Sequence, residues 1–188
     1  MSFERVGSRE VWKGQIGTVK VEKFRHDDGE VVEREVIAHP GAAVMLPLDG
    51  DRIWLVRQPR EAVGEQRLLE LPAGKLNGAD ALETAKRELR EEIGKSAAQW
   101  RFLTSFYASP GFTNERIHAF LATDLSDDPA EAEEEERIEV ISEPVSRIDD
   151  VIRSCEDSKS LVTLLWFRFT VFPVESRPFR KMFVPWKG

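Results

Sequence analysis

The chain has 188 residues, of which 41% are hydrophobic and 32% charged, with a formal net charge of −7 and a pI of about 5.2. The length suits a single domain spanning residues 1–188, and the acidic balance excludes a general nucleic-acid binder, which carries a basic face. A polar start and the lack of a long apolar run argue against a secretory leader and a membrane span. With one cysteine no internal disulfide can form, so we expect a cytoplasmic protein.

Alternating apolar and polar residues predict strands in the first half of the chain. Residues 15–38 are typical of a β-hairpin that turns at Asp28-Gly29. Two nearly continuous apolar runs, 42–48 and 52–58, are typical of central strands in a sheet buried on both faces. Further strands are predicted over 100–107, 116–122 and 137–142.

Apolar residues spaced three and four apart predict helices. In 80–94 such a stripe is followed by Gly94, a C-terminal stop, and its members are Leu82, Ala85, Leu89 and Ile93. A second helix is predicted from about Pro144, with an apolar face formed by Val145, Ile148, Val151 and Ile152. A last helix covers 159–169, and the tail 171–188 has no clear period. This mixture predicts an α/β or α+β sandwich in which helices cover a mixed sheet.

The helix predicted over 80–94 carries a cluster of like charges. Glu88, Glu91 and Glu92 follow an i, i+3, i+4 spacing, so they lie side by side and repel one another. Carboxylate oxygens suit Mg²⁺, which proteins commonly share with substrate phosphates. The cluster therefore predicts a metal site. The alternative is a solvated face on which Glu91 pairs with Arg87 or Lys95.

Residues 70–94 resemble the Nudix box, the signature of the Nudix hydrolases. That box reads Gly, five residues, Glu, seven residues, then Arg-Glu-apolar-x-Glu-Glu-x-Gly-apolar. Gly74 resembles its opening glycine, and its second half is matched by Arg87, Glu88, Leu89, Glu91, Glu92 and Gly94. The chain departs from the box in three ways: the intervening loop is one residue shorter, Ala79 or Asp80 replaces the first glutamate, and Lys95 takes the last apolar position.

The resemblance implies an α/β/α sandwich, with a mixed sheet between helices, that hydrolyses a nucleoside diphosphate derivative. Its metal is Mg²⁺, with Mn²⁺ as a possible substitute. Matching positions implies that Glu88 and Glu92 are metal ligands and that the Ala73 carbonyl supplies a further oxygen. Glu91 would be a ligand or a base, and Arg87 would orient the carboxylates.

Residues outside the box resemble those of ADP-ribose pyrophosphatases. Pro110 and Gly111 match a Pro-Gly that follows the box in these enzymes, and Arg60 matches the arginine of a Gln-x-Arg that contacts a substrate phosphate. Glu70 and Glu115 would face the ribose and diphosphate. The implied reaction splits ADP-ribose into AMP and ribose 5-phosphate. A related nucleoside diphosphate sugar such as GDP-mannose, or a sensor that binds without cleaving, stays as an alternative.

The acidic stretch 127–136 is predicted to be a loop. In related enzymes a mobile loop here supplies a catalytic base, which implies Glu134 as the base and Glu136 as a metal ligand. Because glutamates occupy every position from 133 to 136, the register is open by a residue or two, and a solvated loop is the alternative. The resemblance also implies a homodimer whose contact is made by N-terminal strands within about residues 1–40. It further implies a structural role for the Asp-x-Lys that opens the last helix.

Overall fold

The computed structural model describes residues 2–129 and 137–171. Its elements, in chain order, are β1 (Phe3–Lys13), β2 (Thr18–His26), β3 (Val31–Ala38), β4 (Ala42–Asp49), β5 (Arg52–Arg60), a 3-10 helix (Glu61–Val63), β6 (Glu65–Glu70), β7 (Ala73–Lys75), α1 (Ala81–Ile93), β8 (Lys95–Tyr107), β9 (Arg116–Asp127), β10 (Glu139–Pro144), a second 3-10 helix (Val145–Arg147), α2 (Ile148–Ser154) and α3 (Ser158–Thr170).

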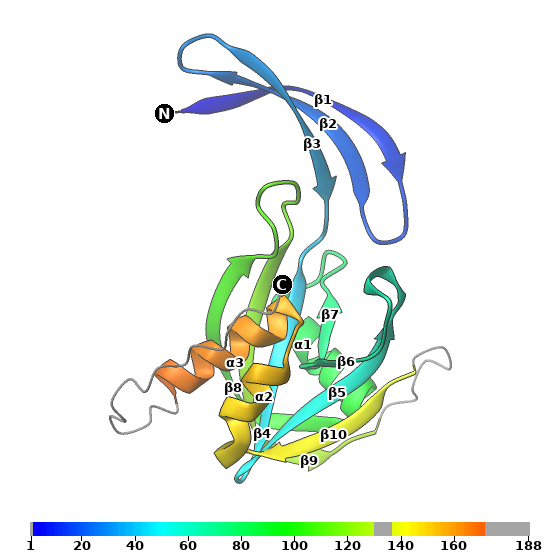
Figure 1. Cartoon of the computed structure of the whole chain (residues 1–188), viewed down its shortest axis with the longest axis vertical. Coiled ribbons are helices and arrows are strands. Elements are labelled where there is room, and N and C mark those ends of the chain that lie inside the picture. Colours follow the sequence, from blue (N-terminus) through cyan, green and yellow to red (C-terminus); the bar gives the residue numbers. More distant parts are fainter. Residues whose placement is uncertain (1, 130–136, 172–188) are drawn as a thin grey trace, which may run out of the picture.

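A mixed sheet forms the centre of the fold. Its strands run in the order β10-β5-β4-β9-β8, with β6 added beside β5 and β7 beside β4. The β4–β9 pair is parallel and the other pairs are antiparallel. α1 covers one face, and α2 and α3 cover the other (Figure 1). The predicted sandwich with helices around a mixed sheet is confirmed.

Side chains of β4 supply apolar contacts to both faces of this sheet. Val44 and Leu46 join the core under α2 and α3, whereas Ala43 and Met45 join the core under α1. Because neighbouring residues of a strand point to opposite faces, a strand buried on both sides has a continuous apolar sequence. This is why 42–48 and 52–58 were correctly predicted as central strands.

A second sheet, β1-β2-β3, projects from the rest of the molecule (Figure 1). The predicted hairpin within 15–38 is confirmed as β2 and β3, which turn at Gly29 with φ of +87°. The residue pattern did not predict β1, because its side chains are mostly exposed and two bulges interrupt its alternation; only the N-terminal strands implied by the resemblance include this range.

The predicted helix over 80–94 is confirmed as α1. The Asp80 side chain accepts hydrogen bonds from the amides of Leu82 and Glu83, and Gly94 ends the helix in the left-handed region at φ +69°. The predictions missed β6 and β7, and β8 and β9 extend further than expected. β6 and β7 are short, and their pairing with β5 and β4 over the sheet decides their conformation.

The helices of the second half also agree with the predictions. Val145, Ile148 and Val151 are buried as expected, and α3 extends one residue beyond the predicted range at each end. Residues 130–136 of the acidic stretch lie outside the described residues. Every helix in the described part of the chain falls short of the length and hydropathy that crossing a bilayer requires.

Candidate active site

The segment from Glu70 to Lys75 brings backbone groups against α1. The Met45 amide donates to the Pro72 carbonyl at 3.0 Å, and β7 pairs with β4, so this segment has a defined position on the sheet. The Ala73 amide donates to Glu92 Oε2 of α1 at 2.9 Å. The predicted backbone ligand and one predicted carboxylate ligand are therefore neighbours.

Gly74 provides the space that Glu88 occupies. A Cβ added at Gly74 would lie 1.9 Å from Glu88 Oε1, so any larger residue would displace the Glu88 side chain. Glu88 and Glu92 are 9% and 8% exposed, and buried carboxylates need partners, which include Arg87 for Glu88 and the Ala73 amide for Glu92. This burial contradicts a solvated face for these two residues.

Arg87 lies on the same helix as the three glutamates. It forms ion pairs with both Glu88 and Glu91, so the predicted pairing of Glu91 is present. Partial burial would lower the pKa of Arg87, but the charges of Glu88 and Glu91 outweigh it and raise the pKa. In the part of the chain that the structure describes, no three acidic, histidine or cysteine side chains form a ready-made metal cluster. The carboxylates are held by Arg87 and the backbone instead.

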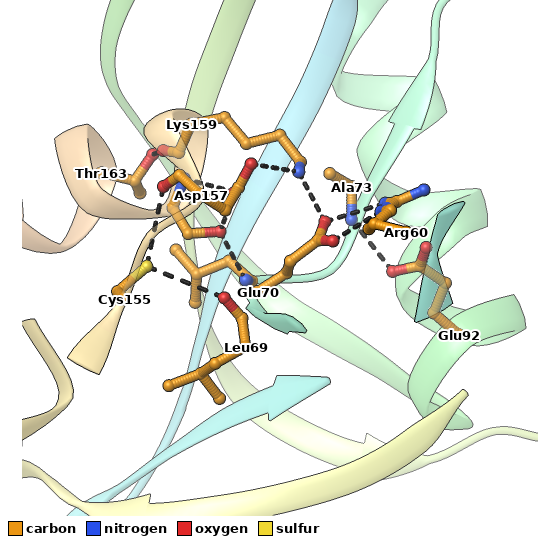
Figure 2. A network of polar contacts seen from close by, with 11 residues as sticks. Arg60, Leu69, Glu70, Ala73, Glu92, Cys155, Asp157, Lys159 and Thr163 are labelled. Carbon is orange, nitrogen blue, oxygen red and sulfur yellow. Dashed lines mark hydrogen bonds and ion pairs between the residues drawn. The ribbon is translucent and has the colours of Figure 1, made fainter. Parts of the chain in front are cut away.

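Arg60 and Glu70 form a bidentate ion pair beside this cluster, as Figure 2 shows. Arg60 Nε and Nη2 donate to the two Glu70 oxygens at 2.6 and 2.8 Å. Lys159 of α3 adds a third hydrogen bond to Glu70 at 2.6 Å. Burial would raise the pKa of Glu70, but these two cations outweigh it and lower the pKa. The hydrogen bond with Glu70 in turn raises the pKa of Arg60.

The predicted site residues after the box lie on the loop between β8 and β9. Pro110 and Gly111 are exposed, and the Glu115 carboxylate lies 3.5 Å from Nδ1 of His39. The same loop holds Ile37, through Thr113 Oγ1 at 2.8 Å. It therefore connects the projecting sheet to the central sheet. Glu134 and Glu136 lie outside the described residues, so their roles stay predictions.

Lys159 and Asp157 are the residues of this region that sequence reasoning assigned only a structural role. The available signal was the Asp-x-Lys at the start of the last helix. Asp157 caps α3, and its side chain also contacts Lys159 at 2.9 Å. Only the tertiary structure shows that Lys159 reaches Glu70, which is distant in the chain.

A comparison with protein families matches the NUDIX domain to residues 38–165. The chain belongs to the Nudix family. An ADP-ribose pyrophosphatase of Bacillus subtilis is 38% identical over 140 residues, which cover 72% of this chain and 75% of that protein. A methanol dehydrogenase activator of Bacillus methanolicus is 31% identical over 169 residues, which cover 87% of this chain and 91% of that protein.

A solved structure described as an ADP compounds hydrolase has the same fold. Its TM-score is 0.78 at 20% sequence identity, over 90% of this chain and 94% of that chain. The predicted Nudix-type α/β/α sandwich is thereby confirmed. This match and the family match confirm the resemblance that the box residues carry.

Proposed function

We propose that this Nudix protein hydrolyses the diphosphate bond of ADP-ribose with the aid of a divalent cation, Mg²⁺ or, as a substitute, Mn²⁺. Water adds to one phosphorus and the bridging P–O bond breaks, so AMP and ribose 5-phosphate leave, with release of the proton from the water. The observation that carries the proposal is the buried pair Glu88 and Glu92 beside the backbone of Ala73 and Gly74. The similarity to an ADP-ribose pyrophosphatase supports the substrate.

The donor set of the site fits a hard divalent cation. Carboxylates of Glu88 and Glu92 and the carbonyl of Ala73 offer oxygen atoms, which Mg²⁺ prefers. When bound, such an ion offsets the charge of a diphosphate and activates water. Glu91 is proposed as a further ligand or base, and Arg87 as the residue that orients Glu88 and Glu91 through its ion pairs. Glu136 and Glu134 are proposed as ligand and base from the acidic stretch.

Arg60 is proposed to bind a phosphate of the substrate. The guanidinium of Arg60 lies next to the cluster. Glu70 has the largest effect in raising the pKa of Arg60, and the charge of Glu92 adds to it. A guanidinium binds phosphate oxygens through its planar set of donors. Pro110, Gly111 and Glu115 are proposed to contact the rest of the nucleotide sugar.

The test is ADP-ribose hydrolysis with and without Mg²⁺, by wild type and by Glu92→Gln. We expect kcat of the variant to fall by about a hundredfold, roughly 2.7 kcal/mol. Glu83→Gln is the matched control, because Glu83 lies on the same helix with a side chain that is 66% exposed. Equal activity of Glu92→Gln and wild type contradicts the metal site. ADP-ribose turnover no better than that of GDP-mannose or UDP-glucose contradicts the substrate, and tight binding without hydrolysis indicates a sensor.

We also propose that the protein is a homodimer that uses the projecting sheet. β1 and the turn after it expose large apolar side chains, namely Phe3, Val11, Trp12 and Ile16. Exposed apolar groups that gather on one element are typical of protein interfaces. Light scattering of the full chain should give twice the monomer mass, and Trp12→Asp should shift the protein toward the monomer. A monomeric wild type contradicts the proposal.

A further inference from the structure

Glu70 is a buried carboxylate shared by two cations from distant parts of the chain. Its side chain is 1% exposed. Oε1 accepts from Arg60 Nε at 2.6 Å, while Oε2 accepts from both Arg60 Nη2 at 2.8 Å and Lys159 Nζ at 2.6 Å (Figure 2). A single pair would satisfy the charge of Glu70, so the second cation needs an explanation.

Arg60 uses only one edge of its guanidinium for Glu70. Nε and Nη2 supply the two donors of that edge, so both N–H groups of Nη1 face elsewhere. In Figure 2 the remaining nitrogen points away from Glu70, on the side where Glu92 lies. The Arg60 side chain is 42% exposed, in contrast to its partner. The bidentate contact therefore sets the direction of the donors that stay accessible.

The second cation holds the carboxylate against which Arg60 packs. Lys159 brings its own anionic partner, Asp157, so Arg60, Glu70, Lys159 and Asp157 together sum to zero and no net charge is added. Oε2 of Glu70 is divided between Arg60 and Lys159, so the position of the carboxylate depends on both cations. Hydrogen bonds to a buried carboxylate are stronger than those in water, so loss of the bond from Lys159 should change how Glu70 holds Arg60.

Lys159 is itself held in position by the first turn of α3. Asp157 Oδ1 lies 2.9 Å from Nζ, and Asp157 Oδ2 accepts from the amide of Ser160 at 3.0 Å. Ser160 Oγ also accepts from the Leu71 amide at 2.7 Å. The same turn thus holds both the Glu70 side chain and the backbone that follows it toward Ala73.

We infer that Lys159 is a positioning residue for Arg60: by binding Oε2 of Glu70, it fixes the carboxylate that orients the guanidinium, so that the free donors of Arg60 point toward a substrate phosphate. This inference rests on the proposed function, in which Arg60 contacts the diphosphate. The inference gives Lys159 a role in substrate binding, although Lys159 lies in the first turn of α3 next to the capping residue Asp157.

The experiment compares Lys159→Gln, Lys159→Arg and wild type in ADP-ribose hydrolysis with Mg²⁺. Loss of one charge-assisted partner should raise KM about tenfold and change kcat by less than about threefold. Lys159→Arg keeps the charge and should return KM to near the wild-type value. The dissociation constant of α,β-methylene-ADP-ribose, measured by calorimetry with Mg²⁺, should rise by the same factor as KM. Lys86→Gln is the control, because Lys86 is an exposed partner of Glu83 on α1.

Several results would overturn the inference. One is an unchanged KM in folded Lys159→Gln, and another is a fall in kcat alone. A third is equal impairment of Lys159→Arg and Lys159→Gln, which indicates a purely structural role. If Lys159→Gln does not fold, Asp157→Asn loosens Lys159 while keeping a capping side chain, and an unchanged KM there also overturns the inference. Absence of ADP-ribose hydrolysis in wild type instead contradicts the proposed function.

Discussion

Gly74 and Glu88 share one volume: a Cβ on Gly74 would lie 1.9 Å from the Glu88 carboxyl carbon and from Oε1. The contact joins β7 to α1, which are separate in the chain. A glycine is needed at position 74 because the Glu88 carboxylate fills the space of a Cβ. The missing side chain of Gly74 in turn lets the buried carboxylate fit between β7 and α1.

We expect Gly74→Ala to reduce activity much more than stability. The new methyl group meets the mobile end of a side chain, so Glu88 can swing away while the backbone stays in place. Displacement of one proposed ligand should reduce metal affinity or kcat by about tenfold to a hundredfold. Titration of Mg²⁺ in the ADP-ribose assay measures this loss. Gly7→Ala is the control, because a Cβ there makes ordinary contacts of 3.6 to 3.7 Å with Lys23. Wild-type activity of Gly74→Ala would contradict the role of Glu88.

We expect the free energy of unfolding to fall in acid because Glu70 loses its charge there. Burial raises its pKa, but Arg60 and Lys159 lower it by more, so its folded pKa lies below that of the unfolded chain. Its contribution to the free energy of unfolding is thus complete above about pH 4.3, the ordinary value for glutamate, and is lost as the pH falls through its folded pKa.

Urea denaturation from neutral to acidic pH measures this contribution. Glu70→Gln should be less stable than wild type at neutral pH, because two cations lose their charged partner, and the difference should shrink in acid. Glu33→Gln is the control, since Glu33 also has a lowered pKa but pairs with Lys23 on the surface. A constant difference between Glu70→Gln and wild type would contradict the ionised pair.

Asp80, one of the two residues that could replace the first glutamate of the box, caps α1. Its Oδ1 accepts from the amides of Leu82 at 2.8 Å and Glu83 at 3.2 Å. We expect Asp80→Ala to lower the free energy of unfolding by about 1 kcal/mol, while Asp80→Asn stays near wild type. Thermal denaturation with kcat as a second readout would show whether Asp80 acts only as a cap. An equal loss in both variants would contradict the capping role.

Cys155 should be unreactive in the folded protein. Burial raises the pKa of its thiol to about 11. The thiolate is the reactive form, so a disulfide reagent at pH 8 should modify native protein far more slowly than protein in urea. Equal rates in both conditions would contradict the buried location.

Local patterns were enough for the helix that carries the carboxylates of the proposed metal site. The stripe of α1, its cap and the Arg-Glu…Glu-Glu spacing depend on contacts within one or two turns, and the structure confirms this helix. β1 was missed because its pattern lacks a buried face, and β6 and β7 because their conformation depends on strands elsewhere in the chain. The resemblance predicts that Glu70 faces the ribose and diphosphate, and this role stays a prediction; the ion pairs of Glu70 with Arg60 and Lys159 could not be predicted.

The sequence by itself determined the central strands, the helices and the glutamate cluster, because apolar periodicity and helical spacing are local properties. The tertiary structure alone decided which charges meet. It set Gly74 against Glu88, Ala73 against Glu92, and Lys159 with Arg60 on Glu70. Such contacts join residues far apart in the chain, and their strength depends on burial, which only the packed sheet and helices create.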